Sequence, residues 1–154
     1  MTCPTITADW PQTLLASPTT GPSSADETSG AWRLVLEHGP QAPSSARSAV
    51  RRVMRAWGVH EETVDDVLMV VSEFVTNAVH YAEPPIAVNL GHCDDQAVLV
   101  SVTDGGPRPV EDQYGADRPA DEHGRGTHIV DALAVDAGAA AGDGLVSHWA
   151  VVSP

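Results

Sequence analysis

Three residues of one predicted helix carry side chains that could bind a metal ion and move a proton. Glu73, Asn77 and His80 stand at i, i+4 and i+7, which aligns them along one edge of an α-helix. A carboxylate and a carboxamide one turn apart offer the oxygen ligands that Mg²⁺ prefers, while water and substrate phosphates supply the rest. A carboxylate there can also orient or deprotonate an attacking group. The alternative is a solvated polar stripe on a core helix, which is the commoner situation for this stretch alone.

Two glycine-containing segments further along the chain offer partners for this pair. Asp104-Gly-Gly106 ends a predicted strand, where Asp can accept a hydrogen bond from an exocyclic amine such as that of adenine, and Gly lets the backbone approach a flat ring. Gly124-Arg-Gly126 begins a predicted helix, whose backbone N–H groups and dipole favour phosphate. Each signal is weak alone. The first is equally a plain turn, and the second is no dinucleotide fingerprint because Ile129 takes the third glycine position.

Hydrophobic periodicity predicts the elements that must position these side chains. Apolar residues recur at three- and four-residue steps in the stretch that carries the acidic residue and the amide, which predicts a long amphipathic helix. The expected order is strand 31–38, helix 44–57, helix 63–82, strands 86–91 and 97–103, helix 127–134, and strands 135–140 and 145–152. This order predicts an α+β two-layer sandwich, with a mixed, mostly antiparallel sheet and helices on one face.

Two stretches fall outside these elements. Residues 1–30 are rich in Thr, Ser, Pro, Ala and Gly and lack an apolar period, so we expect a disordered tail in which Trp10, Leu14 and Leu15 are a stray apolar cluster. Residues 31–154 then form one domain. Residues 108–123 are rich in Pro, Asp, Glu and Gly, and a connection of this length inside a small domain is typical of a functional lid.

Composition excludes several classes of function. The formal net charge of −13 argues against nucleic acid or an anionic membrane as a partner. All eight cationic side chains are Arg, so no chemistry that depends on Lys can be proposed. Cys3 and Cys93 are the only cysteines, from which neither a disulfide framework nor a Cys-based zinc site follows. No run has transmembrane length or the layout of a signal peptide, so we expect a cytoplasmic protein.

Together and in this order, the segments resemble the motifs of the Bergerat-fold (GHKL) ATPase superfamily. The resemblance covers about residues 31–152 and is closest to single-domain anti-sigma-factor serine/threonine kinases and their actinobacterial ATP-binding relatives. Val71-Ser-Glu73-Phe-Val-Thr-Asn77-Ala-Val resembles the N-box, and Val102-Thr-Asp104-Gly-Gly106-Pro the first glycine box. Gly124-Arg-Gly126-Thr-His-Ile-Val-Asp-Ala-Leu-Ala resembles the second glycine box, and Ser147-His-Trp149-Ala the last strand.

The resemblance implies ATP and Mg²⁺ as ligands and assigns a role to each motif residue. Asn77 would bind Mg²⁺, and Glu73 would be the catalytic base or orient the attacking hydroxyl. Asp104 would hold the adenine amine, with Gly106 beneath the ring.

The remaining assignments concern the phosphates and the last strand. Gly124, Arg125, Gly126 and Thr127 would form the phosphate-binding segment at the end of the lid. Ser147 matches a Thr that helps the first-box Asp to position adenine.

The chain departs from the family pattern at three places. The N-box ends in His80-Tyr81, where a basic residue followed by His is common. Arg108 replaces the second Gly of the first glycine box, and Thr127 stands where Leu is usual. None of these changes removes the Glu, Asn, Asp and Gly residues on which nucleotide binding depends.

The resemblance favours an anti-sigma-factor kinase that binds a sigma factor and phosphorylates a small antagonist (anti-anti-sigma) protein on a hydroxyl. It also implies a homodimer through the first strand and helix. Two alternatives stay open. One is a non-catalytic module that binds ATP or sequesters a partner, and the other is a free-standing histidine-kinase-like domain that acts on a separate phosphoacceptor.

Overall fold

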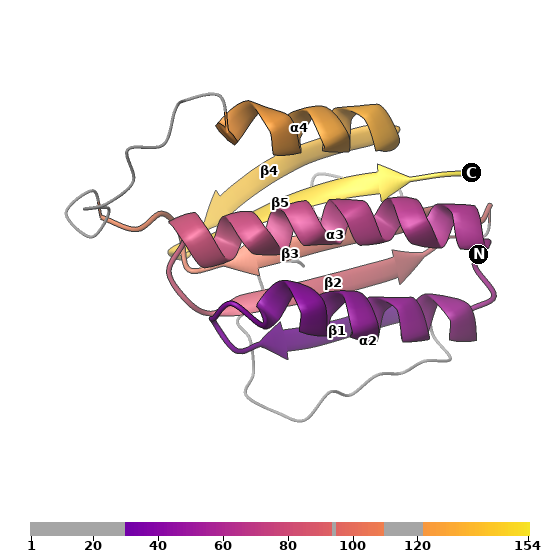
Figure 1. The fold of residues 1–154 in the computed structure, drawn as a ribbon, viewed down its shortest axis with the longest axis horizontal. Coiled ribbons are helices and arrows are strands. Elements are labelled where there is room, and N and C mark those ends of the chain that lie inside the picture. The colour runs from indigo at the N-terminus through magenta and orange to yellow at the C-terminus, as the bar shows by residue number, and fades with distance from the viewer. Residues whose placement is uncertain (1–29, 94, 110–121) are drawn as a thin grey trace.

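A computed structural model describes residues 30–93, 95–109 and 122–154, with the backbone alone for residues 122–127. Its five-stranded sheet has the order β1-β2-β3-β5-β4, and every neighbouring pair is antiparallel. Three helices lie on the same face of this sheet (Figure 1). The elements are β1 (Ala31–Leu36), α2 (Ala42–Ala56), α3 (Glu61–Tyr81), β2 (Ile86–His92), β3 (Val98–Asp104), α4 (Glu122–Leu133), β4 (Asp136–Gly142) and β5 (Leu145–Val152). The predicted α+β sandwich is confirmed.

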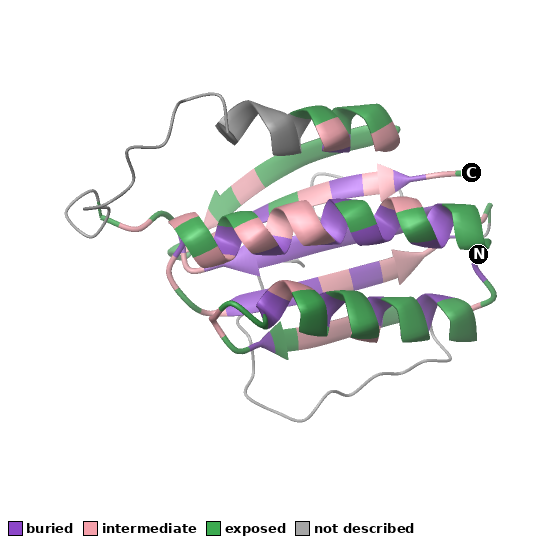
Figure 2. Ribbon diagram, in the orientation of Figure 1, coloured by how far each residue is buried: buried purple, intermediate pink, exposed green. Residues whose placement is uncertain are grey.

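Helix α3 lies across the middle of the sheet and contributes more residues to the core than any other element (Figure 2). Its side chains at Val64, Val67, Val71 and Val75 have no exposed surface. They pack with side chains of the central strands that alternate toward the helices, because successive residues of a strand point to opposite faces. The buried strand residues of this core are Ile86, Val88, Leu90, Val98, Val100, Val102, Ala150 and Val152.

The same alternation decides where Asp104 points. Val98, Val100 and Val102 face the helices, so Asp104, two residues further on, faces them too, at the end of β3. The carbonyl end of α3 lies beside this strand end, since Ala82 and Pro107 form an isolated bridge there. The carboxylate is thereby brought to the half of α3 that carries Glu73 and Asn77.

Helix α4 begins earlier than the sequence predicts. It starts at Glu122 instead of Thr127, so Gly124 and Gly126 lie within its first turns instead of before it. Gly has the lowest helix propensity of the non-proline residues, which is why sequence patterning places the boundary after it.

Two predictions made from composition concern residues outside the described part of the chain. The expected tail, residues 1–30, is not described except for Gly30, and residues 110–121, which make up most of the expected lid, are likewise not described. Both stay predictions. Among the described residues, none of the helices combines the length and apolar character needed to cross a membrane.

Candidate functional site

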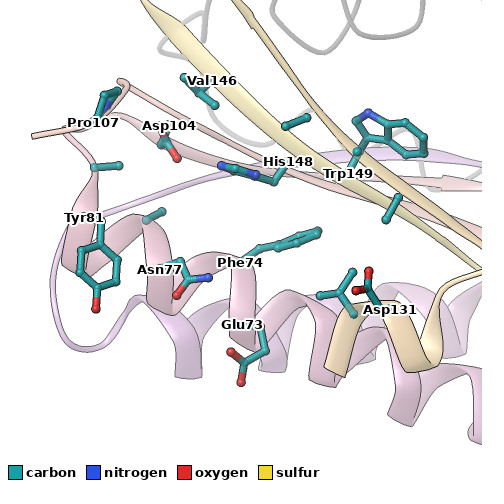
Figure 3. Close-up of a pocket in the computed structure, with 16 residues that line it drawn as sticks. Glu73, Phe74, Asn77, Tyr81, Asp104, Pro107, Asp131, Val146, His148 and Trp149 are labelled. Atoms are coloured by element: carbon teal, nitrogen blue, oxygen red, sulfur yellow. The ribbon is translucent and has the colours of Figure 1, made fainter. Parts of the chain in front are cut away.

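A cavity of about 690 Å³ lies between α3, α4 and the end of the sheet formed by β3, β5 and β4 (Figure 3). It brings together residues that are far apart in sequence. The helix α3 and the residue after it contribute Glu73, Phe74, Asn77, Ala78, Tyr81 and Ala82; the end of β3 and the following loop contribute Asp104 and Pro107; α4 contributes Val130 and Asp131; and β4 and β5 contribute Ala137, Gly138, Ala139, Val146, His148 and Trp149.

The polar stripe of α3 reaches the cavity, with one change from the prediction. Glu73 and Asn77 both line it, one helical turn apart, as expected. His80 does not line it; its ring is exposed and lies 6.0 Å from that of Tyr81. Tyr81 lines the cavity instead, because it follows Asn77 by four residues whereas His80 follows Asn77 by three, which places the two rings on opposite sides of Asn77 around the helix.

Asp104 is the buried carboxylate of the site, with 5% of its surface exposed. Its Oδ1 accepts a hydrogen bond of 2.8 Å from the backbone N–H of Gly106. Burial raises the pKa of this carboxyl above its usual range, while the Gly106 N–H and the charge of His148 partly counter the effect. With Oδ1 fixed by the backbone, the carboxylate is held in one orientation toward the cavity, suited to accepting an N–H from a ligand.

The loop after Asp104 is clamped to the segment that follows α3 by three backbone hydrogen bonds. Glu83 N–H donates to Gly106 O at 2.8 Å, Gly105 N–H donates to Glu83 O at 2.7 Å, and Arg108 N–H donates to Tyr81 O at 2.9 Å. A Cβ at Gly105 would lie 2.3 Å from the carbonyl oxygen of Pro84, so only glycine fits. Gly106 has φ +85, the left-handed region that also favours glycine.

Arg108, which replaces a glycine of the family motif, has a structural role that sequence reasoning missed. Its Nε donates to the carbonyl oxygen of Ala82 at 3.1 Å, and one terminal nitrogen lies 3.1 Å from His38 Nε2. The same His38 nitrogen is 3.0 Å from Ala82 O. A cation at the carbonyl end of α3 complements the helix dipole. Arg108 therefore ties the end of α3 to the loop that carries Gly106.

His148, which receives no role from the sequence motifs, also lines the site. It lies on β5 next to Val102 of β3, its ring is 6.0 Å from that of Phe74, and its charge acts on Asp104. Figure 3 shows it between Asp104 and Phe74. Alternation along β5 could have predicted this position, because His148 stands two residues before Ala150 of the core, and residues two apart on a strand share a face.

Ser147 is not brought to the cavity. It pairs with Thr103 in the β3–β5 register, and its hydroxyl oxygen accepts a hydrogen bond of 3.2 Å from Thr103 Oγ1. Because Asp104 faces the helices, its neighbour Thr103 and that residue's partner Ser147 face the other side of the sheet. The expected help from Ser147 in placing a base beside Asp104 is therefore not seen.

The second glycine box forms the beginning of α4, and that helix forms one wall of the cavity through Val130 and Asp131. Gly124 belongs to the first turn, whose N–H groups have no partner inside a helix. The side chains of Arg125 and Thr127 lie outside the described part of the structure. The phosphate-binding role of Gly124, Arg125, Gly126 and Thr127 stays a prediction.

The charge of the cavity indicates what kind of ligand arrangement it can hold. Three carboxylates, from Glu73, Asp104 and Asp131, line it, and no Arg or Lys is among its described lining residues. A polyphosphate therefore needs a cation to enter. The oxygens of Glu73 and Asn77 fit Mg²⁺, which takes one or two protein oxygens and shares the rest of its shell with water and phosphate. In the described residues no three His, Cys, Asp or Glu side chains could hold a metal ion by themselves.

Comparison with solved structures identifies the fold. A crystal structure of the RsbU and RsbW domains of Rv1364c from Mycobacterium tuberculosis matches with a TM-score of 0.62 and 21% sequence identity, over 80% of this chain and 32% of that one. The chain thus spans about a third of the length of that structure. The SiaB–SiaC complex from Pseudomonas aeruginosa matches with a TM-score of 0.58 and 18% identity, over 81% of this chain and 91% of that one.

Comparison of sequences identifies the family. The sequence model of the histidine kinase-like ATPase domain matches residues 36–145, which include the N-box, both glycine boxes and most of the sheet. No curated protein sequence matches the chain significantly. The family match confirms the resemblance drawn from the motifs, and an ATPase domain implies ATP as the ligand. The protein belongs to the histidine kinase-like ATPase domain family.

Proposed function

We propose that the protein is an ATP-dependent serine/threonine protein kinase of the anti-sigma-factor type, which binds Mg-ATP in the cavity beside α3 and phosphorylates a small antagonist protein. The observation that carries the proposal is the convergence of Glu73, Asn77 and Asp104 on one cavity in a chain of the histidine kinase-like ATPase family. By the same resemblance, a sigma factor is the second partner, a homodimer is the working form, and the cytoplasm, where ATP is abundant, is the place of action.

The chain's own residues divide the work of binding. Asp104 accepts the exocyclic amine of adenine, and the turn at Gly106 leaves room for the flat ring. Asn77 would hold Mg²⁺, which would supply positive charge beside the phosphates in a cavity that is itself lined by carboxylates. The beginning of α4 binds the phosphates: the first turn, which includes Gly124, offers free N–H groups, and Arg125 and Gly126 follow it in the chain.

Phosphoryl transfer then depends on Glu73. An oxygen of Glu73 accepts the proton of the substrate hydroxyl while the hydroxyl oxygen forms its bond to the γ-phosphorus. The bond between that phosphorus and the bridging oxygen to the β-phosphate breaks, and ADP leaves. Positioning and charge stabilisation supply most of the rate of such a reaction, so the one-turn spacing between Glu73 and Asn77 matters more than the strength of the base.

The proposal is tested with Glu73→Gln, which keeps the size of the side chain and removes its basicity. Purified wild-type protein and the variant are incubated with γ-³²P-ATP and a lysate of the source organism. We expect a labelled protein band with the wild type, a loss of labelling of about 10²- to 10⁴-fold in the variant, and ATP affinity within about threefold of the wild type.

The stability of the label separates the alternatives. Phosphate that survives acid indicates a Ser or Thr ester and supports the proposal, whereas acid-labile phosphate indicates transfer to His and overturns it. Equal labelling by the wild type and Glu73→Gln would show that Glu73 is not the base. ATP binding without any Glu73-dependent labelling would leave a non-catalytic module that uses ATP as a structural ligand.

A further inference from the structure

The strand pairing decides which residue of β5 stands beside Asp104. In the β3–β5 register Asp104 pairs with Val146, and the side chains of two directly paired antiparallel residues lie on the same face of the sheet. The position next to Asp104 on the helix side therefore holds an apolar side chain. Ser147 carries the only hydroxyl of β5, and it lies on the opposite face, bonded to Thr103. No hydroxyl of β5 is thus available to help Asp104 hold a base.

His148 is the next residue of β5 on the helix side. It pairs with Val102, two residues before Asp104, so His148 and Asp104 are diagonal neighbours across the two strands. Such neighbours lie about 7–8 Å apart, which is within reach of an aromatic side chain. Burial raises the pKa of Asp104, and the charge of His148 partly counters this effect. Figure 3 shows the imidazole extending from β5 toward Asp104.

The imidazole of His148 is open to the cavity instead of being packed into the core. The side chain is exposed and lines the cavity, whereas Ala150 and Val152, the next residues on the same face of β5, have no exposed surface. The ring of Phe74 lies at a centroid distance of 6.0 Å, which is typical of interacting aromatic pairs. Phe74 therefore supports the imidazole from one side and leaves its nitrogens to a ligand.

Few side chains of the cavity can donate a hydrogen bond beside Asp104. Among the described lining residues, the side-chain donors are Asn77, Tyr81, His148 and Trp149. The amide of the first is the proposed Mg²⁺ ligand. The hydroxyl of Tyr81 points away from Asp104, and Trp149, which follows His148 on β5, points to the opposite face of the sheet (Figure 3). The backbone N–H of Gly106 already donates to Asp104. His148 is the side-chain donor that remains on this side of the cavity.

Adenine presents a hydrogen-bond donor between two acceptors. Its exocyclic amine donates, and the two ring nitrogens that flank the amine, N1 and N7, accept. Asp104 Oδ1 is bonded to Gly106 N–H, which leaves Oδ2 to accept from the amine, while an imidazole N–H can only donate. We propose, building on the ATP-binding function proposed above, that His148 is the second residue that recognises the base. Its ring N–H donates to one of the two flanking nitrogens while Asp104 accepts from the amine.

The test combines a substitution in the protein with a change of one atom in the ligand. His148→Phe keeps a ring beside Phe74 and removes both nitrogens. The analogues 1-deaza-ATP and 7-deaza-ATP each replace one flanking nitrogen of the base with carbon. Calorimetric titration in the presence of Mg²⁺ gives the affinity of the full-length wild type and of the variant for ATP and for both analogues.

The expected result is a loss that occurs only once. The wild type should bind one of the two analogues about 5- to 10-fold more weakly than ATP, which is the range of a single hydrogen bond. His148→Phe should bind ATP more weakly than the wild type by a similar factor. The variant should bind that same analogue as tightly as it binds ATP, because the contact is already absent.

Two controls show that the base keeps its place in the variant. Purine riboside triphosphate, which lacks the exocyclic amine, should bind more weakly than ATP to both proteins, because Asp104 still accepts from the amine. His60→Phe changes an exposed histidine at the beginning of α3 whose side chain makes no capping hydrogen bond, and it should bind all ligands as the wild type does. Circular dichroism checks the fold of each variant.

Three results would overturn the proposal while the ATP site itself stands. The wild type could bind ATP and both deaza analogues equally, a result that needs no variant. His148→Phe could bind ATP as the wild type does. The loss with the analogue could persist in the variant, which would assign the ring nitrogen to another group. No binding of ATP to the wild type is a different result, which would contradict the proposed function and His148 recognition together.

Discussion

The substitution Gly105→Ala tests how closely the backbone of the first glycine box approaches the backbone that follows α3. The added Cβ would lie 2.3 Å from Pro84 O, 2.7 Å from Glu83 O and 2.9 Å from Pro84 C, against an ordinary contact distance of 3.4 Å or more. All three atoms belong to the backbone, so a side-chain rotation cannot relieve the clash. The two segments must separate by about 1 Å, which is on the scale of destabilising overpacking.

The expected cost follows from two contributions. Overpacking of this size costs about 1–3 kcal/mol. Separation also weakens the hydrogen bonds from Gly105 N–H to Glu83 O and from Glu83 N–H to Gly106 O, each with a net value of about 1 kcal/mol. We expect a loss of about 2–4 kcal/mol in the free energy of unfolding, or a decrease in Tm of about 5–15 °C. Since Asp104 is the preceding residue, ATP affinity should also decrease at least tenfold, or about 1.4 kcal/mol.

The assay is thermal unfolding of the wild type and the variant without nucleotide, followed by ATP titration of each. Gly39→Ala is the matched control, because an added Cβ there meets nothing within 4 Å. It should leave Tm unchanged or raise it slightly, through the lower entropy of the unfolded chain. A Gly105→Ala protein with the Tm and ATP affinity of the wild type would refute the close approach of the two segments.

The remaining predictions concern Asp104 and Arg108. Burial raises the folded-state pKa of Asp104, so the charged form of this carboxyl destabilises the folded protein. This destabilisation is absent below the unfolded-state pKa and develops as pH rises through the folded-state pKa. Asp104→Asn should therefore have a higher Tm than the nucleotide-free wild type at neutral pH, a difference that vanishes in acid; a pH-independent difference would contradict the assignment. Arg108→Met removes the hydrogen bond to Ala82 O and should cost about 1–3 kcal/mol in chemical unfolding, whereas Arg52→Met, on the exposed face of α2, should cost less than about 0.5 kcal/mol.

The parts of the site that the sequence predicts are those encoded by local periodicity. Glu73 and Asn77 lie in a long helix whose valines recur at helical spacing, and Asp104 ends an alternating strand, so their meeting follows once the helix packs on the sheet. The same reasoning anticipated the α+β architecture.

The parts that it missed depend on register and on contacts across the chain. The side chain of Ser147 points to the sheet face opposite the helices and that of His148 points to the helix side. Which β3 residues they lie beside depends on a pairing between β3 and β5 that no local pattern specifies. In the sequence, Arg108 stands where the family motif has a glycine. Only the folded chain shows its hydrogen bond to the carbonyl oxygen of Ala82, next to His38. The start of α4 was placed too late because its glycines oppose a helix locally.

The central claim is that the cavity beside α3 binds Mg-ATP through Asp104. The most direct measurement is calorimetric titration of ATP into the wild type and Asp104→Asn, each with and without Mg²⁺. The account predicts Mg²⁺-dependent binding to the wild type and a loss of about 10- to 150-fold in affinity for the variant, the value of a hydrogen bond to a charged acceptor. Binding that is the same in both proteins, or no binding to the wild type at millimolar ATP, would contradict it.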